Sequence, residues 1–219
     1  LIRNYIDFDM IREMNPFIGS DSFFGSVGTY FQELLKENGI TGIHIRTKPN
    51  PGFLDSIPQP NDRNMQPLSK LVVQKHGQMG LFFNGDGSHY GVVSSSGEFL
   101  SCMQASAVIL DEWLNLRGRE FEIYTEFFTP VAVNRLAAYN HMKPSPLCKV
   151  WEENRGLDRG LIWDRHSVIF GPFLPERDGI FQGLLLLQAL CRHDMDWQKL
   201  HLKVEKLTEN RCWEQKSIN

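Results

Sequence analysis

Hydrophobic positions along the chain switch repeatedly between helical and strand spacing. Apolar residues recur at helical intervals in the ranges 1–14, 27–35, 64–74, 100–116, 131–137, 181–191 and 197–207. Short apolar runs typical of strands lie at 42–46, 79–83, 90–93, 121–125, 149–151, 161–163 and 168–170. This alternation predicts an α/β fold of two consecutive three-layer α/β/α domains, each with a mixed, mostly parallel sheet.

The most informative stretch is residues 79–93, in which two apolar runs flank the turn Asn84-Gly85-Asp86-Gly87-Ser88-His89. Asn-Gly and Asp-Gly pairs between apolar runs are a strong hairpin signal. The same turn carries side-chain oxygens at every second position, in Asn84, Asp86 and Ser88, and Mg²⁺ prefers oxygen ligands. An EF-hand is excluded, because His89 and Ser95 stand where that loop requires Gly and Glu. A structural hairpin and a cation loop both remain open.

This turn resembles the metal loop of the α-D-phosphohexomutases, the phosphoglucomutase/phosphomannomutase family, whose pattern is Asp-Gly-Asp-x-Asp-Arg. Gly85 and Asp86 match, whereas Asn84, Ser88 and His89 replace Asp, Asp and Arg. The resemblance implies Asn84, Asp86 and Ser88 as metal ligands and His89 as a substrate-binding position. One carboxylate with an amide and a hydroxyl neutralises a dication poorly, so we expect this degenerate loop to hold Mg²⁺ weakly.

Further motifs extend the resemblance along the chain. Asp21 and Gly25 fit a strand ending of the family, and Pro58-Gln59-Pro60-Asn61 fits its Pro-x-Pro-Asn loop. Asp178-Gly179-Ile180 fits the pattern before its Leu-rich helix, where we expect Asp178 to be an N-cap. The family's sugar-binding loop corresponds to Ile162–Ser167, which implies Asp164 and His166 as substrate-binding residues on a rebuilt loop.

The resemblance covers the second and third of the family's four domains. It implies a domain II-like unit at residues 1–75 and a domain III-like unit at residues 76–219, with the metal-like loop in the latter. The family's phosphoserine loop and its Arg-rich phosphate clamp belong to the other two domains, and neither is recognisable here. We therefore expect either a fragment or a protein that lacks the phosphoryl-transfer machinery.

Composition narrows the remaining classes. The 219 residues are 42% hydrophobic and 22% charged, with a net charge of −3, which gives no electrostatic basis for binding nucleic acid or an anionic membrane. The four cysteines are scattered, as in reduced intracellular proteins. No signal peptide and no membrane-spanning apolar run is visible, so we expect the cytoplasm or an organelle interior such as a plastid, and not secretion.

Two hypotheses for function follow. The first is a catalytically inactive phosphohexomutase-like protein that binds a sugar phosphate, a protein partner or its missing domains. The second is part of a divergent, active sugar-phosphate mutase, an isomerase that uses Mg²⁺. Three changes in one metal loop favour the first hypothesis, since truncation explains missing domains but not altered ligands.

Overall fold

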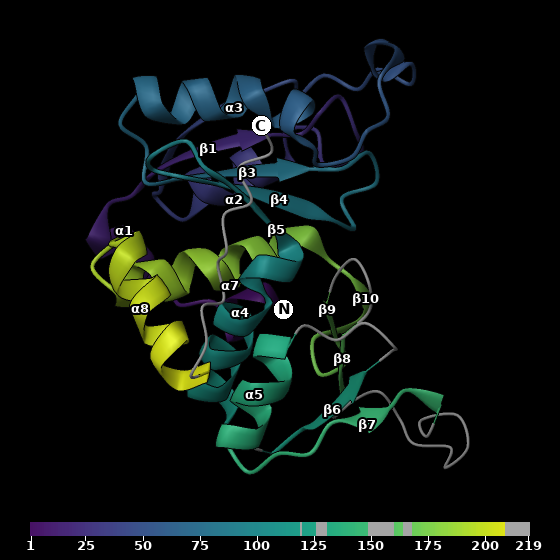
Figure 1. The fold of residues 1–219 in the computed structure, drawn as a ribbon. Coiled ribbons are helices and arrows are strands. Elements are labelled where there is room, and N and C mark those ends of the chain that lie inside the picture. The colour runs from purple at the N-terminus through teal and green to yellow at the C-terminus, as the bar shows by residue number, and fades with distance from the viewer. Residues whose placement is uncertain (119, 126–130, 149–159, 164–167, 209–219) are drawn as a thin grey trace, which may run out of the picture.

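The computed structural model describes residues 1–118, 120–125, 131–148, 160–163 and 168–208 (Figure 1). This part of the chain forms two five-stranded sheets with helices packed on them. The first sheet has the order β2-β1-β3-β4-β5 and the second has the order β10-β9-β8-β6-β7.

The first sheet joins a parallel half to an antiparallel half. Strand β1 pairs in parallel with β2 and β3, whereas β3 with β4 and β4 with β5 are antiparallel hairpins. Its strands are β1 (Phe17–Asp21), β2 (Thr41–Ile45), β3 (Met79–Phe83), β4 (Tyr90–Ser94) and β5 (Phe99–Ser101). Its sequence region also contains η1 (Ile2–Asn4), α1 (Phe8–Met14), α2 (Tyr30–Glu37), η2 (Phe53–Asp55) and α3 (Asp62–Gln74).

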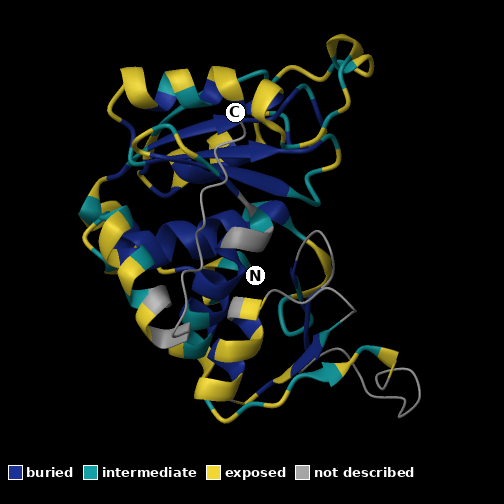
Figure 2. Ribbon diagram, viewed as in Figure 1, coloured by how far each residue is buried: buried dark blue, intermediate teal, exposed yellow. Residues whose placement is uncertain are grey.

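Side chains of β3 alternate between two apolar layers, as the pleat of a strand requires. Phe82 belongs to a cluster with Leu68 and Val72 of α3, so α3 covers one face. Leu81 and Phe83 point into the main core on the other face, which α2 and the late helix α7 cover. Figure 2 shows this sheet buried, with α3 exposed on its outer side and α7 buried along most of its length.

The second sheet repeats the mixed pattern. Strand β6 pairs in parallel with β7 and β8, whereas β8 with β9 and β9 with β10 are antiparallel. Its strands are β6 (Glu122–Thr125), β7 (Ser145–Pro146), β8 (Gly160–Trp163), β9 (Val168–Phe170) and β10 (Leu174–Arg177). The helices of this region are α4 (Cys102–Arg117), α5 (Val131–Tyr139), α7 (Gly179–Arg192) and α8 (Trp197–Thr208). The predicted α/β class with two mixed sheets is confirmed, with parallel and antiparallel pairings in equal number in each sheet.

Helix α7 joins the two halves. It is buried along most of its length, packs on α4, and also contacts β3, β4 and α1. One core cluster consequently contains Leu81 of the first sheet, Leu184 of α7 and Trp163 of the second sheet. The all-round apolar sequence of α7 is therefore explained by its position between the first sheet and α4.

The sequence located most helices but missed several strands. The apolar runs do not predict strand β1, because Asn15-Pro16-Phe17-Ile18-Gly19 lacks apolar alternation, yet its last four residues are buried between β2 and β3. Strand β5 lies where we expected the start of a helix. Strands β7 and β10 contain no apolar run, so the sequence did not predict them. The expected strand at 149–151 lies outside the described residues.

The predicted division between residues 75 and 76 falls inside the first sheet. Backbone hydrogen bonds join β1, before that position, to β3, after it. The change from one sheet to the other instead follows Ser101, where β5 leads directly into α4. No compositional linker marks either position. Only the hydrogen bonds between strands show where one sheet ends and the other begins.

A buried polar network fastens α7 to α4 and α1. Glu112 is 2% exposed and accepts hydrogen bonds from Gln188 Nε2 at 2.6 Å and Arg192 Nε at 2.8 Å. The side-chain Oε1 of Gln188 accepts from the backbone N–H of Asp7, the residue that caps α1. Burial, followed by the charge of Glu112, raises the pKa of the neighbouring Cys191 to about 12, which keeps that thiol protonated.

We expect Glu112→Ala to lower the free energy of unfolding by about 3 kcal/mol, because fully buried Gln188 would lose its acceptor. Asp111→Ala is the matched control, since its bond to Lys203 is partly exposed and should contribute less than about 1 kcal/mol. Urea unfolding of both variants measures the difference. If both substitutions lowered the free energy of unfolding equally, the buried network would not stabilise the fold more than the partly exposed pair does.

Among the described residues, no helix has both the length and the apolar character needed to cross a membrane. Cys102, Cys148 and Cys191 are free thiols.

Candidate functional site

Three parallel strands place their carboxyl ends at one edge of the first sheet. Strands β2, β1 and β3 end there at Ile45, Asp21 and Phe83, and the loops that follow them lie together. Crevices at such edges are the usual binding sites of α/β proteins. The metal-like turn 84–89 follows β3, so the structure puts it where a site is expected.

The turn 84–89 closes a regular hairpin. Phe83 pairs with Tyr90, and the backbone N–H of Asn84 donates to the carbonyl of His89 at 3.1 Å. The backbone N–H of Gly87 donates to the carbonyl of Asn84, and Gly87 has a φ of +77°, which favours glycine. The predicted hairpin is therefore confirmed.

Side chains inside the turn bond mainly to one another. Asn84 is 3% exposed, and its Oδ1 accepts the backbone N–H of His89 at 2.9 Å. This fixes its amide nitrogen beside Nδ1 of His89 at 3.0 Å and Oγ of Ser88 at 3.3 Å. Oγ of Ser88 also lies 3.0 Å from Nδ1 of His89, so the three side chains form one connected cluster.

Asp86 is held by Ser88. Its Oδ1 accepts from the Ser88 backbone N–H at 2.9 Å and from the Ser88 hydroxyl at 2.6 Å. Partial burial alone would raise the pKa of this exposed carboxyl, but the bonds from Ser88, together with Asn84 and His89, lower it below its ordinary value. Asp86 is therefore an anion near neutral pH.

Three other segments clamp the backbone of the turn. Ser26 N–H donates to the carbonyl of Gly85 at 2.8 Å, and Gly85 N–H donates to the carbonyl of Pro58 at 3.2 Å. Gly179 N–H donates to the carbonyl of Gly87 at 2.9 Å. Three motifs that are separate in the sequence thus meet at this turn. They are the Asp-x-x-x-Gly strand ending, the Pro-x-Pro-Asn loop and the start of α7.

The start of α7 has the expected cap. Oδ1 of Asp178 accepts the backbone N–H of Phe181 at 2.9 Å, which confirms Asp178 as the N-cap. Burial raises the pKa of Asp178, partly offset by backbone hydrogen bonds. A Cβ on Gly179 would lie 2.8 Å from the carbonyl oxygen of Gly87, so this contact requires glycine.

A buried ion pair supports the same edge of the sheet. Arg46 Nε donates to both carboxylate oxygens of Asp21, at 2.9 and 3.0 Å, and its Nη2 also contacts Asp21. Nη2 further donates to the carbonyl of Asn64 at 2.6 Å, and the guanidinium lies 4.3 Å from the ring centre of Phe23. Burial raises the pKa of Asp21, and the charge of Arg46 opposes that rise. Arg46 was not predicted, because nothing local in sequence links it to Asp21.

The structure brings together four of the six predicted site residues. Asn84, Asp86, Ser88 and His89 form one hydrogen-bonded turn. Asp164 and His166 lie outside the described residues, so their placement stays a prediction. Within the described ranges, no group of three or more His, Cys, Asp or Glu side chains is arranged as a metal site.

The donor set of the turn fits Mg²⁺ poorly. Asp86 supplies the only carboxylate of the turn, and its Oδ1 already accepts two hydrogen bonds. The oxygen of Asn84 is bonded to a backbone N–H, and its amide N–H₂ points toward Ser88 and His89. A small dication that demands octahedral oxygen ligands would have to displace these bonds.

Comparison with known proteins shows which proteins the chain resembles. Residues 1–97 match the family model "Phosphoglucomutase/phosphomannomutase, alpha/beta/alpha domain II". A phosphoglucomutase/phosphomannomutase of Thermococcus kodakarensis is 22% identical over 206 residues, which are 91% of this chain and 44% of that protein. The chain is thus similar to the phosphoglucomutase/phosphomannomutase family, through the domain II model over residues 1–97 and through this relative over most of its length.

Solved structures share the fold. The open form of Paramecium pp63/parafusin, a phosphoglucomutase, superposes with a TM-score of 0.75 at 18% identity, over 94% of this chain and 40% of that chain. A family protein from Burkholderia thailandensis gives a TM-score of 0.65 at 20% identity, over 84% and 43%. The chain thus spans less than half the length of these relatives. The domain II match includes the turn 84–89, which the sequence had assigned to the second unit.

Proposed function

We propose that this chain is a catalytically inactive phosphohexomutase-type module in which the turn 84–89 is not a metal site. The turn instead acts as a structural joint, meaning that its hydrogen bonds hold neighbouring segments of the chain together. The observation that supports this most is the closed set of hydrogen bonds among Asn84, Asp86, Ser88 and His89. These bonds use the oxygen atoms that a Mg²⁺ ion would need. Phosphoryl transfer depends on such an ion to neutralise developing charge, so its loss removes a required part.

As a joint, the turn connects both halves of the molecule. Its backbone bonds to Ser26 and Pro58 within the first unit and to Gly179 at the start of α7. We propose domain II at residues 1–101 and domain III from residue 102 onward, with α7 as their common helix. A module of this kind would bind a sugar phosphate or a protein partner, inside the cytoplasm or an organelle.

The alternative is part of a divergent mutase that uses Mg²⁺. Asp86 supports it, because this carboxylate is exposed and its pKa is lowered, so it is available as an anion. A cation would then have to reorganise Asn84 and Ser88 around that single charge.

Titration with Mg²⁺ and Mn²⁺ by calorimetry tests the proposal. We expect no saturable binding by the natural chain, whereas Asn84→Asp/Ser88→Asp/His89→Arg should bind the cation saturably because two carboxylates are added. Asn84→Asp/Ser88→Asp serves as a second variant that leaves partly buried His89 in place. Ser95→Asp is the matched control, since it adds a carboxylate to a different turn.

Micromolar binding by the natural chain would overturn the proposal and support the divergent enzyme. Failure of both restored variants to bind, although folded, would show that the surrounding loop and not its ligands excludes the cation, which also contradicts the proposed cause.

A further inference from the structure

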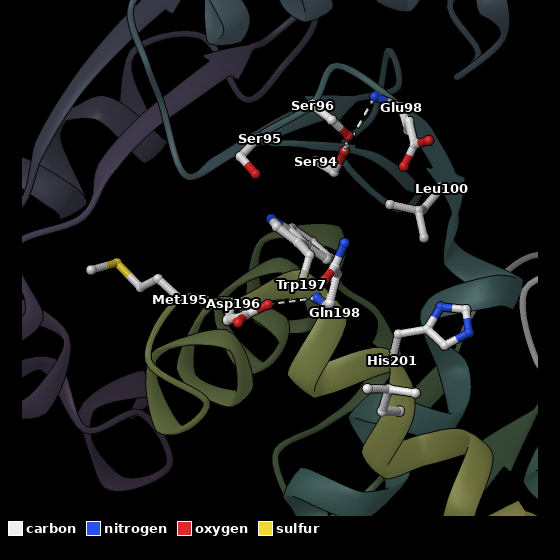
Figure 3. A pocket seen from close by; sticks show the side chains of 11 residues that line it. Ser94, Ser95, Ser96, Glu98, Leu100, Met195, Asp196, Trp197, Gln198 and His201 are labelled. Carbon is white, nitrogen blue, oxygen red and sulfur yellow. Dashed lines mark hydrogen bonds between the residues drawn. The ribbon is translucent and has the colours of Figure 1, made fainter.

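A large hollow lies at the opposite edge of the first sheet from the turn 84–89. It has a volume of about 860 Å³ and lies between the β4–β5 turn and the segment that leads into α8 (Figure 3). Helix α7 spans the distance, because it begins beside Gly87 and ends three residues before Met195 of the hollow. Its 14 residues correspond to about 20 Å, so the two places are separate.

One wall of the hollow is aromatic and fixed. Trp197 points from the start of α8 toward the serine turn, beside Gln198 (Figure 3). Nε1 of Trp197 donates to the carbonyl of Gln78 at 2.8 Å, which orients the indole. Since indole has a single N–H donor, what Trp197 offers to the hollow is its apolar ring. Leu100 and Met195 also line the hollow.

The other wall is rich in hydroxyl and acceptor groups. Ser94, Ser95 and Ser96 lie side by side, with Ser94 Oγ 2.8 Å from Ser96 Oγ. Ser95 and Gln198 are exposed and therefore accessible to a ligand. The carboxylates of Glu98 and Asp196 also line the hollow, and no Lys or Arg does so among the described residues.

The charge of this lining disfavours anions. Two carboxylates face the hollow, and the N-terminus of α8 is already satisfied, because Asp196 Oδ1 accepts the N–H groups of Gln198 and Lys199 at 2.8 and 3.1 Å. A phosphate would therefore meet repulsion from two carboxylates, and the described lining holds the imidazole of His201 and serine hydroxyls but no Lys or Arg to offset it. A purely apolar ligand would bury serine hydroxyls without partners, which costs free energy.

We propose that this hollow binds a neutral saccharide. The apolar face of a sugar ring would pack on Trp197, and its hydroxyls would donate to the carboxylate and serine oxygens opposite. A volume within the usual range for small-molecule sites accommodates one or two sugar rings. The site is independent of the proposed joint, because it shares no residue with the turn 84–89.

Nuclear magnetic resonance titration of the full chain with glucose, maltose and glucose 6-phosphate tests this inference. We expect saturable shifts in residues 94–98 and 195–202 with maltose, and about tenfold weaker binding of glucose 6-phosphate than of glucose. Trp197→Ala should lower maltose affinity at least about tenfold. Because this variant also loses the bond to Gln78, Ser95→Ala and Gln198→Ala act as exposed, fold-neutral variants with an expected loss of about threefold each.

Tyr139→Ala, an exposed aromatic substitution on α5, is the control and should leave affinity unchanged. Shifts absent up to the solubility limit of maltose would overturn the inference. So would tighter binding of glucose 6-phosphate than of glucose, or an affinity that all three hollow variants leave unchanged.

Discussion

Replacing Gly25 by alanine is expected to lower the free energy of unfolding by about 3 kcal/mol and to separate the turn 84–89 from the β1 loop. A Cβ at Gly25 would lie 2.5 Å from the carbonyl oxygen of Gly85 and 2.9 Å from its Cα. These are backbone atoms, so no side-chain rotation relieves the overlap. The bond from Ser26 N–H to Gly85 would be lost with the contact.

Gly52→Ala is the matched control for Gly25→Ala. It lies in a loop of the same unit, its φ is −82°, and the nearest atom to a new Cβ is a side-chain oxygen of Asn50 at 3.5 Å. We expect a change within about 0.5 kcal/mol, measured by urea unfolding. Equal stability of the two variants would mean that the turn moves away without cost and does not act as a joint.

Replacing Arg46 by methionine is expected to cost about 3–5 kcal/mol, because it leaves the carboxylate of Asp21 buried without its cation. Asp21 is fully buried, and the Arg46 side chain is only 18% exposed. The substitution also removes the bond to the Asn64 carbonyl and the contact with Phe23. Arg12→Met is the control, since its partner Asp9 is exposed and the pair should contribute less than about 1 kcal/mol.

The Arg46→Met variant should also gain stability as pH falls. Burial already raises the pKa of Asp21 above its ordinary 3.8, and without Arg46 the pKa rises further. The native state then binds a proton that the unfolded state releases, between pH 3.8 and the raised value, so stability increases toward the lower end of that window. Denaturant unfolding of Arg46→Met across this pH range measures the slope.

The double variant Asp21→Asn/Arg46→Met removes both charges and keeps an acceptor for the backbone N–H of Phe23, which Asp21 accepts at 2.9 Å. It should recover part of the lost stability and should lose the pH dependence. A double variant as unstable and as pH-dependent as Arg46→Met would assign the effect to packing against Phe23 instead of the buried charge.

The sequence by itself determined most of the helices and the central hairpin. Helical spacing of apolar residues predicted α3, α7 and α8, and the Asn-Gly and Asp-Gly pairs predicted the turn between β3 and β4. The cap at Asp178 was also predicted, because such signals depend on residues that are neighbours in the chain. Four candidate site residues lie together for the same reason, since they belong to one six-residue turn.

The tertiary structure decided what depends on distant partners. Strand β1 forms despite its Gly-Ser-Asp sequence because β2 and β3 supply its hydrogen bonds. The pairing of Asp21 with Arg46 joins residues 25 positions apart, and the bond of Gly179 to Gly87 joins the two halves of the molecule. The extent of the first sheet, the closure of the turn on itself and the hollow beside Trp197 likewise arise only when separate segments meet, because local spacing carries no information about which surfaces will pack together.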